Sequence, residues 1–457
     1  MSGEAVGGGG RVRAFRAVPE PVPDVAPGTG GGVRDWTVLG AEDGPVADAL
    51  RRASRPGGAP GVAVVLGERY RDAYDAVLLD AVARAEAGAG RVVLLHRGAG
   101  GASLLRAAAR ESAGRLRVAS AELPADRSAP WPAGWDAGRL AGVADAVGGE
   151  LRVAGRTGVP AAGAVARLGW QPAALTSRVQ SREGPPSRDG TDACQGAGPP
   201  GGTGPCGGTA MPCGGTAIVT GGLGGLGLRV ASVLAVVHGM RPVLLDVSAP
   251  EELAGRDAGV WRRLRDQSGV MALRVDLTDA GATDAALRRV PGPVRAVVHC
   301  AGLVAGGPVA RTRADDLREL RDAKVGTLRH VLAGIDAEEL RHLVVFGSVT
   351  ARAPHRNMGG YALANEVLRR ETLRWAPHLP YAATVVAEWS LWSGAGQAHA
   401  MGAVAQARRM GMVPVALRPG MAALSRLLAR PAGPGNADAL VLVGAGDPLF
   451  PPAAVRT

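Results

Sequence analysis

The segment from Leu343 to Asn365 reads LVVFGSVTARAPHRNMGGYALAN, and it decides how the rest of the chain is interpreted. Its apolar start has the length and branching of a buried parallel strand. Ser348 follows at the carboxyl end of that strand, and Tyr361 opens a helical pattern that ends near Trp375. The two hydroxyls are thirteen residues apart (361 − 348). Because ligands bind outside the carboxyl ends of parallel strands, we expect both hydroxyls to face one site.

A lysine beside the tyrosine would complete such a site. A nearby ammonium lowers the pKa of tyrosine from about 10, which makes the phenol a better proton donor. The chain has one lysine, Lys324, among its 52 Lys and Arg residues. It lies just upstream, in the helical segment ADDLRELRDAKVGTLRHVLAG. Its compact ammonium suits this role better than a planar guanidinium does. The alternative is a surface lysine unrelated to a core tyrosine.

These residues resemble the ketoreductase domains of modular (type I) polyketide synthases, within the short-chain dehydrogenase/reductase superfamily. Ordinary members carry Tyr-x-x-x-Lys, whereas the fourth residue after Tyr361 is Asn365. The polyketide ketoreductases exchange the two positions, with the lysine on the preceding helix, as in Ala323-Lys324-Val325-Gly326 here. The resemblance implies that Tyr361 donates a proton, Ser348 holds the carbonyl oxygen, Lys324 lowers the pKa of Tyr361 and grips the nicotinamide ribose, and Asn365 orders the lysine and a water.

A glycine-rich turn predicts the cofactor site. TAIVT (216–220) is a predicted strand, GGLGGLG follows, and the next residues form an amphipathic helix. Glycines there let the backbone approach a pyrophosphate, which the free N–H groups of the helix amino terminus hold. The motif alone is weak, but its position between strand and helix, upstream of the serine and tyrosine, makes it specific. The predicted contacts are Thr220, Gly221, Gly222, Leu223, Gly225, Leu226 and Gly227.

The next strand, PVLLD, ends at Asp246, nineteen residues past Gly227 (246 − 227). An acidic residue there binds the ribose hydroxyls of NADH and repels the 2′-phosphate of NADPH. The resembling family uses NADPH and carries Ser-Arg-Arg near this position, so the resemblance favours NADPH and Asp246 leaves NADH open. Arg241 and Arg256 are candidate substitutes for the missing arginines.

Two further strand ends complete the predicted cofactor site. Asp276 and Leu277 follow the strand MALRV, where the superfamily caps the adenine. VRAVVHCAG is another strand, whose tip holds Cys300, Ala301 and Gly302. The segment SLWSG after the strand YAATVVAEW resembles the family's tryptophan segment beside the nicotinamide. The resemblance further implies a lid helix within GQAHAMGAVAQARRMGMVPVAL.

The predicted fold class is α/β, with two Rossmann-like parallel-sheet subdomains. Residues 1–32 are rich in Gly and Pro and are predicted to be a flexible lead-in. Residues 33–175 alternate strands (61–66, 91–95, 115–119) with helices (72–87, 102–112, 131–147), which predicts a parallel sheet. Residues 176–215 are a predicted linker, and residues 216–457 form the doubly wound catalytic subdomain.

The first subdomain is predicted to bind no cofactor. Gly98-x-Gly100-Gly101 lacks the full glycine spacing and has no acidic residue at a later strand end, so we interpret it as a tight turn. The resembling family has a truncated structural subdomain at this place. Three of the four cysteines lie in the linker, at spacings that match no zinc motif.

Composition excludes several other functions. No apolar run reaches the ~18 residues of a membrane span, and the amino terminus has no secretory signal. Four cysteines in 457 residues indicate no disulfide framework, so a cytoplasmic location is expected. The net charge of +11 comes from dispersed arginines, and aromatic residues make up 3%, which argues against nucleic-acid binding.

The resemblance implies reduction of a β-ketoacyl chain to a β-hydroxyacyl chain. The substrate would arrive on the phosphopantetheine arm of an acyl carrier protein, and neighbouring synthase domains are further candidate partners. Two alternatives stay open: a catalytically silent scaffolding module, and a discrete reductase of a free ketone. The family's stereochemical markers are absent, because residues 304–306 read Val-Ala-Gly and the position eight before Tyr361 is Ala353.

Overall fold

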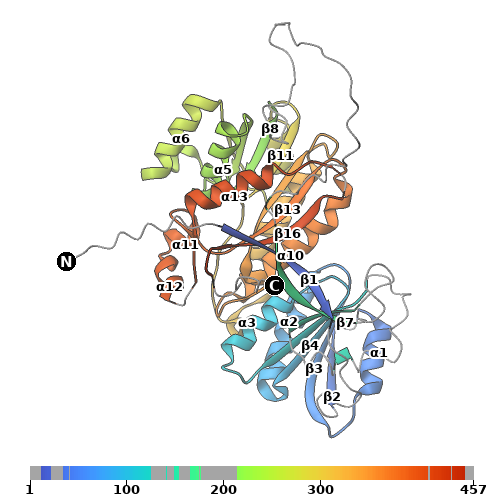
Figure 1. Cartoon of the computed structure of the whole chain (residues 1–457). Coiled ribbons are helices and arrows are strands. Elements are labelled where there is room, and N and C mark those ends of the chain that lie inside the picture. The colour runs from blue at the N-terminus through green and yellow to red at the C-terminus, as the bar shows by residue number, and fades with distance from the viewer. Residues whose placement is uncertain are drawn as a thin grey trace, which may run out of the picture.

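The computed structural model describes residues 12–21, 34–40, 42–124, 140–141, 149–153, 165–173, 175, 214–409, 412–433 and 435–447. Its main feature is a 14-stranded sheet that runs through both halves of the chain, as Figure 1 shows. The strand order is β10-β9-β8-β11-β12-β13-β16-β1-β7-β6-β5-β4-β3-β2. The predicted α/β class is therefore confirmed.

The part of the chain from residue 214 onward, which the sequence predicts to be catalytic and which is called the catalytic half below, contributes seven parallel strands. In spatial order they are β10 (Met271–Arg274), β9 (Arg241–Asp246), β8 (Thr216–Thr220), β11 (Val294–His299), β12 (His342–Ser348), β13 (Ala383–Trp389) and β16 (Ala437–Gly444). The chain order reverses between β8 and β11. That switch point opens a crevice at the carboxyl ends of the strands.

Helices cover both faces of this half-sheet, because alternate strand residues point to opposite sides. One apolar core packs α5 (Gly225–Val236), α6 (Gly255–Ser268) and α13 (Leu417–Leu428) against the sheet. The core on the other face packs α7 (Ala280–Leu287), α8 (Ala314–Arg321), α9 (Thr327–Ala333) and α10 (Gly359–Trp375). None of the described helices is long and apolar enough to cross a membrane.

The first half repeats the strand–helix alternation on a smaller scale. Its parallel strands are β2 (Arg34–Leu39), β3 (Ala59–Leu66), β4 (Arg91–His96), β5 (Arg117–Glu122) and β6 (Gly149–Val153). The helices are α1 (Gly44–Ala53), α2 (Ala73–Arg84) and α3 (Ala102–Glu111), and a π-turn (Ala85–Ala89) extends α2. The predicted helix over 131–147 lies outside the described residues apart from 140–141.

The lead-in prediction for residues 1–32 is wrong for Val12–Pro21. This segment forms β1, which pairs antiparallel with β16 on one side and with β7 (Val165–Pro172) on the other. Phe15 is buried, and it packs with Val349, Val441 and Val443. The flanking Gly/Pro stretches hid a short strand whose pairing partners lie far away in the sequence. Most of the predicted linker, 176–213 with its three cysteines, lies outside the described residues.

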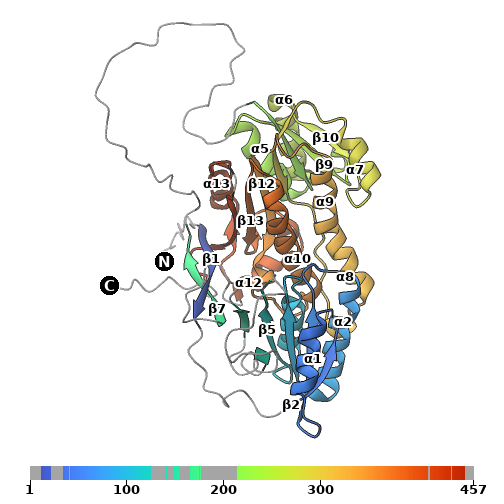
Figure 2. The same cartoon turned by 90° about the vertical axis from the view of Figure 1, so that its right-hand side faces the viewer.

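Buried charged side chains join the two halves where α2 and α3 pack against α8 and α10; Figure 2 shows α2 beside α8. Arg321 of α8 donates to both carboxylate oxygens of Asp75 of α2, at 2.9 and 2.8 Å. Glu366 of α10 accepts from the backbone N–H of Ser103 at 2.9 Å and from its hydroxyl at 2.7 Å. A Cβ on Gly100 would lie 2.8 Å from Glu366 Oε1. The carboxylate of Glu366, from the catalytic half, therefore occupies the amino terminus of α3, next to the glycine turn of the first half.

Candidate active site

A cavity of about 1620 Å³ lies at the carboxyl ends of β8, β9, β11, β12 and β13. Residues from the glycine-rich turn, from the β9 and β11 ends, and from the β12–α10 connection line it together. The predicted site residues that line it are Gly221, Leu223, Gly225, Leu226, Gly227, Asp246, Asp276, Leu277, Cys300, Ala301, Gly302, Lys324, Ser348 and Tyr361. The structure thus brings together most of the set that was predicted from the sequence.

The glycine-rich turn has the geometry of a close-approach loop. Gly221 adopts a positive φ of 62°, and a Cβ on Gly227 would lie 2.2 Å from the carbonyl oxygen of Gly221. α5 begins after Gly224 without a side-chain cap, and the first N–H groups of a helix have no partner within it. Gly222 lies behind the cavity wall, where its Cβ would meet Leu244 at 2.6 Å. The first N–H groups of α5, which follow this turn, can receive an anion.

Thr220 lies behind the wall as well, in a hydrogen-bond chain that sequence reasoning missed. His299 Nε2 lies 2.9 Å from the carbonyl oxygen of Lys324, and His299 Nδ1 lies 2.7 Å from Thr220 Oγ1. A carbonyl only accepts, so Nε2 carries the proton and Nδ1 accepts from the threonine hydroxyl. Burial lowers the pKa of His299 to about 3, which keeps the ring neutral. His299 therefore ties β8 and β11 to the turn that bears Lys324; its place at a strand end was the only signal in the sequence.

Lys324 lies in a π-helical turn, Asp322–Gly326, between α8 and α9. Such turns are frequent at functional sites. The side chain is 5% exposed, and its Nζ donates to the carbonyl oxygen of Phe346 at 3.2 Å. Burial lowers the pKa of Lys324 from 10.5 to about 8. A Cβ on Gly302 would lie 2.7 to 2.9 Å from the Cγ, Cε and Nζ atoms of Lys324, so the lysine reaches the cavity only because residue 302 is glycine.

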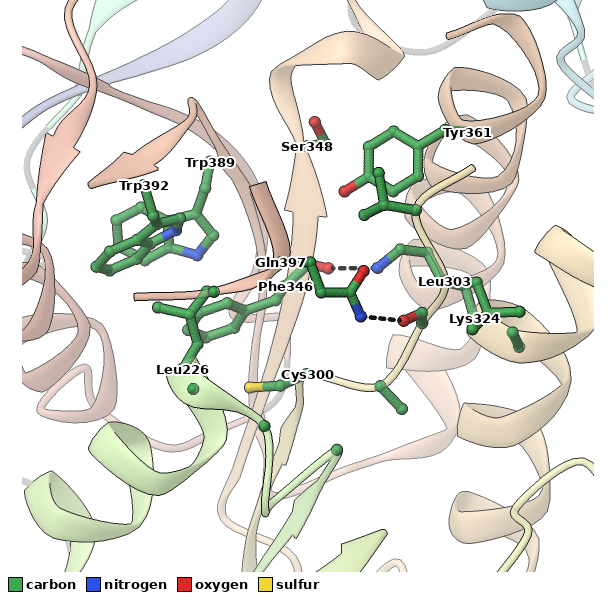
Figure 3. A pocket seen from close by; sticks show the side chains of 18 of the residues that line it. Leu226, Cys300, Leu303, Lys324, Phe346, Ser348, Tyr361, Trp389, Trp392 and Gln397 are labelled. Atoms are coloured by element: carbon green, nitrogen blue, oxygen red, sulfur yellow. Dashed lines mark hydrogen bonds between the residues drawn. The ribbon is translucent and has the colours of Figure 1, made fainter. Parts of the chain in front are cut away.

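The hydroxyls of Ser348 and Tyr361 face the same part of the cavity, as Figure 3 shows. Ser348 ends β12, and its Oγ accepts from the backbone N–H of Thr350 at 3.2 Å and from the hydroxyl of that residue at 2.9 Å. Tyr361 lies in the first turn of α10, as predicted. The Nζ of Lys324 lies 5.9 Å from the centroid of the tyrosine ring.

The predicted effect of Lys324 on the pKa of Tyr361 is not met in this structure. Burial raises the pKa of Tyr361 above 10, and hydrogen bonds from Ser348 and Asn365 oppose that rise. The reason is geometric, since the ammonium of Lys324 is directed at Phe346 and not at the phenol oxygen.

Asn365 lies one turn further along α10, behind the cavity wall. Its Nδ2 donates to the carbonyl oxygen of Tyr361 at 2.7 Å. Its buried Oδ1 has no hydrogen-bond partner among the described residues. An unpartnered buried oxygen leaves room for a donor such as a water or an ammonium.

Both carboxylates at the predicted adenosine end accept hydrogen bonds from backbone N–H groups. Asp246 accepts from Leu223 at 2.9 Å and from Ser248 at 3.0 Å. Asp276 accepts from the N–H and hydroxyl of Thr278, which lowers the pKa of Asp276. Neither Arg241 nor Arg256 lines the cavity. Arg274, in register with Asp246 on the neighbouring strand, donates from Nε to the carbonyl oxygen of Val247 at 3.0 Å.

The nicotinamide end predicted from the sequence is apolar. Burial raises the pKa of Cys300 to about 12, so its thiol stays protonated. Phe346, Trp389 and Trp392 form an aromatic cluster with ring centroids 4.6 to 6.3 Å apart. The predicted lid is two short helices, α11 (Gln397–Ala400) and α12 (Ala403–Arg409), because Gly402 adopts a positive φ of 71° between them. Gln397 Nε2 donates to the carbonyl oxygen of Gly302 at 3.1 Å, across the cavity (Figure 3).

Comparison with known proteins identifies the family. The family model described as KR domain matches residues 215–394. Polyketide synthase GfsA of Streptomyces halstedii is 32% identical over 181 residues, which are 38% of this chain and 2% of the synthase. Erythronolide synthase EryA2 of Saccharopolyspora erythraea is 29% identical over 191 residues, 38% of this chain and 5% of that protein. The matched part of the chain, residues 215–394, is therefore assigned as a ketoreductase domain of the modular polyketide synthase type.

Solved ketoreductase structures share the fold over nearly the whole chain. The ketoreductase from the first module of phoslactomycin biosynthesis in Streptomyces sp. HK803 superposes with a TM-score of 0.67 at 22% identity, covering 95% of this chain and 93% of that one. An A-type ketoreductase from a modular polyketide synthase gives 0.68 at 23% identity, covering 96% and 93%. Ketoreductase domains of this family are oxidoreductases of the short-chain dehydrogenase/reductase type that bind a nicotinamide cofactor.

Proposed function

We propose that this ketoreductase domain reduces the β-keto group of a polyketide intermediate to a β-hydroxyl. One observation carries the proposal: Lys324, Ser348 and Tyr361 converge on one cavity that also contains the glycine-rich turn. Lys324 comes from the turn between α8 and α9, Ser348 from the end of β12 and Tyr361 from the start of α10, whereas the glycine-rich turn comes from a distant segment. Polar side chains that converge on an open, largely preformed pocket are the arrangement expected of an active site.

The cavity fits a nicotinamide dinucleotide. Gly225 and Gly227 keep the turn free of side chains, and the amino terminus of α5 supplies N–H groups for the pyrophosphate. Asp276 and Leu277 would hold the adenine, and Ala301 and Gly302 would lie beside the nicotinamide. When bound, the reduced cofactor supplies the hydride for the carbonyl carbon.

Tyr361 is the proposed proton donor to the carbonyl oxygen, and Ser348 is the proposed donor that holds that oxygen. Burial raises the pKa of Tyr361, which keeps the phenol protonated and able to donate at neutral pH. Lys324, with a pKa of about 8, is mostly an ammonium at neutral pH. Its charge, near the tyrosine ring, would stabilise the phenolate that forms when the proton leaves. The unpartnered Oδ1 of Asn365 is the proposed acceptor for the lysine or for a relay water.

For the cofactor we propose NADPH, with NADH as the second candidate. Family membership favours NADPH. Arg274 does not line the cavity, but its Nε donates to the carbonyl oxygen of Val247, which does, so Arg274 is the proposed substitute for the family's missing arginines. Asp246 favours NADH, because a carboxylate repels a 2′-phosphate. Steady-state kcat/KM with each cofactor decides between them. A higher kcat/KM with NADH would indicate that Asp246 determines which cofactor the protein uses.

The proposed substrate carrier is an acyl carrier protein that presents the intermediate on a phosphopantetheine arm. The curated relatives are far longer than this chain, which spans 2% to 5% of their length. Neighbouring synthase domains are therefore proposed as further partners. The net charge of +11 suits an acidic carrier protein.

We also propose that residues 33–175 form a structural subdomain that binds no cofactor. The supporting observation is Glu366, whose carboxylate bonds Ser103 at the amino terminus of α3. That carboxylate takes the N–H group that a phosphate would need. The interdomain linker over 176–215 remains a prediction.

The experiment is reduction of a β-ketoacyl thioester surrogate with NADPH or NADH, with Tyr361→Phe as the test variant. Cofactor oxidation by the wild type, and its loss in the variant with cofactor affinity retained, is the expected result. If the wild type oxidises neither cofactor, the protein is a silent scaffolding module. Equal turnover of a free cyclic ketone and a carrier-bound substrate would identify a discrete ketone reductase.

A further inference from the structure

We propose that Glu111, in the first half of the chain, is a positioning residue that holds one wall of the active site in place. The inference rests on the proposed ketone reduction and adds a role for the half that carries none of Lys324, Ser348 and Tyr361. Glu111 is the last residue of α3 and is half-buried. No sequence motif points to it.

The two carboxylate oxygens of Glu111 bind two different loops of the catalytic half. Oε2 accepts from the backbone N–H of Val309 at 2.7 Å. Oε1 accepts from the backbone N–H of Asn357 at 2.9 Å. Val309 begins the short 3-10 helix Val309–Arg311 at the end of the loop that leaves β11, and Asn357 belongs to the loop between Ser348 and Tyr361. A single side chain therefore fastens both loops to α3.

Both loops form part of the cavity wall. Leu303, Val304 and Gly306 line it from the first loop, and His355, Arg356, Asn357 and Met358 line it from the second. The loops also bond to each other, since the N–H of Gly307 donates to the carbonyl oxygen of Asn357 at 2.8 Å. Four residues after Asn357 comes Tyr361. Displacement of this pair of loops would shift the proposed proton donor relative to a substrate.

Two features describe how the arrangement is held. Asn357 adopts a positive φ of 61°, a left-handed conformation that asparagine accepts more readily than other non-glycine residues, and its N–H is thereby presented to Glu111. Glu111 itself lies at the carboxyl end of a helix, where the helix dipole disfavours an anion. The backbone N–H groups of Val309 and Asn357, which lie outside the helix, stabilise the negative charge of Glu111 instead.

A carboxylate is required for both bonds. An ionised glutamate accepts at both oxygens, whereas glutamine accepts at one and presents an N–H₂ group at the other. In Glu111→Gln, one of the two backbone N–H groups would therefore face the N–H₂ group of the glutamine, and two donors would meet. The volume of the side chain would be nearly unchanged. The substrate's ketone would then meet a displaced wall, although the glycine-rich turn on the opposite side of the cavity is untouched.

The test compares Glu111→Gln and Glu111→Ala with the wild type and with Glu86→Gln. Glu86 is an exposed carboxylate of the same half, in the π-turn after α2, so its variant makes the same change of charge. For both Glu111 variants we expect kcat/KM for the thioester to fall about tenfold or more, while the Kd for the cofactor stays within about twofold. The ratio of the two alcohol stereoisomers should change as well. A generally destabilised protein would lose cofactor affinity in parallel and would keep its stereoisomer ratio.

Amide hydrogen exchange gives a readout that does not depend on turnover. We expect faster exchange at Val309 and Asn357 in both Glu111 variants and not in Glu86→Gln. If the wild type reduces no ketone, the proposed function fails, and exchange alone still tests the fastening of the loops. Unchanged exchange at both amides, or unchanged kcat/KM and stereoisomer ratio in an active enzyme, would overturn the inference.

Discussion

Gly302→Ala tests a close contact with Lys324 in the proposed active site. A Cβ at this position would lie 2.7 Å from Cγ, 2.8 Å from Cε and 2.9 Å from Nζ of Lys324, distances that real Cβ atoms essentially never show. The lysine side chain must move, and it then loses the hydrogen bond from Nζ to the carbonyl oxygen of Phe346. A hydrogen bond from a charged group contributes about 1.5–3 kcal/mol. Since about 1.4 kcal/mol corresponds to a tenfold change in rate, we expect kcat/KM for ketone reduction to fall about 10- to 100-fold.

Gly292→Ala is the matched control for this prediction. Gly302 has a positive φ of 150° and Gly292 one of 68°, so alanine strains the backbone at both positions. A Cβ on Gly292 meets no atom within 4 Å, and the residue lies before β11, at the end of that strand remote from the cavity. The control should lose stability while its kcat/KM stays near that of the wild type. Steady-state kinetics and thermal unfolding of both variants separate the effect of backbone strain from the effect of displacing Lys324. Equal kcat/KM values for the two variants would refute the contact argument.

Three further predictions follow from buried charges. Burial lowers the pKa of Lys324 from 10.5 to about 8, so the ammonium is lost as pH rises through about 8, and kcat/KM should fall there; a flat pH–rate profile across that value would contradict the proposed role. Over the same window, from about 8 to 10.5, the unfolded chain binds more protons than the folded one, and this lysine's contribution to the free energy of unfolding rises with pH. Glu388 is fully buried and pairs with Arg352 at 2.9 Å and Arg369 at 3.3 Å. Glu388→Gln should therefore lower the free energy of unfolding by about 3–5 kcal/mol in urea titrations, and a loss no greater than that of the exposed Glu338→Gln would show that this carboxylate contributes little.

Short-range sequence patterns predicted those parts of the site in which a strand, a turn and a helix follow one another along the chain. Ser348 at the end of a branched apolar run and Tyr361 at a helix start are fixed by short-range patterns, and so is the glycine-rich turn. The structure also has Asp246, Asp276 and Cys300 at the strand ends where the sequence predicted them. These predictions depend on residues within about twenty positions of one another, which periodicity and turn chemistry resolve.

Long-range partners could not be predicted in the same way. β1 was missed because its partners β7 and β16 lie far away along the chain. The π-helical turn that directs Lys324 at Phe346 has no sequence signature, so the predicted lowering of the pKa of Tyr361 was wrong although both residues line the same cavity. Glu111 reads as an ordinary charged residue at the end of a helix until the loops that it fastens are known. Each failure concerns a contact between segments that no periodic pattern links.

The position of β1 has a consequence for how the molecule melts. This one strand supplies the pairing partner for the edge of each half-sheet, through β16 and through β7. If either half unfolds, β1 loses its hydrogen bonds to that half, and the half that stays folded is left with an unpaired strand edge. Partial unfolding therefore costs free energy in both halves. We therefore expect a single cooperative transition in calorimetry, in which the supporting half and the catalytic half come apart together.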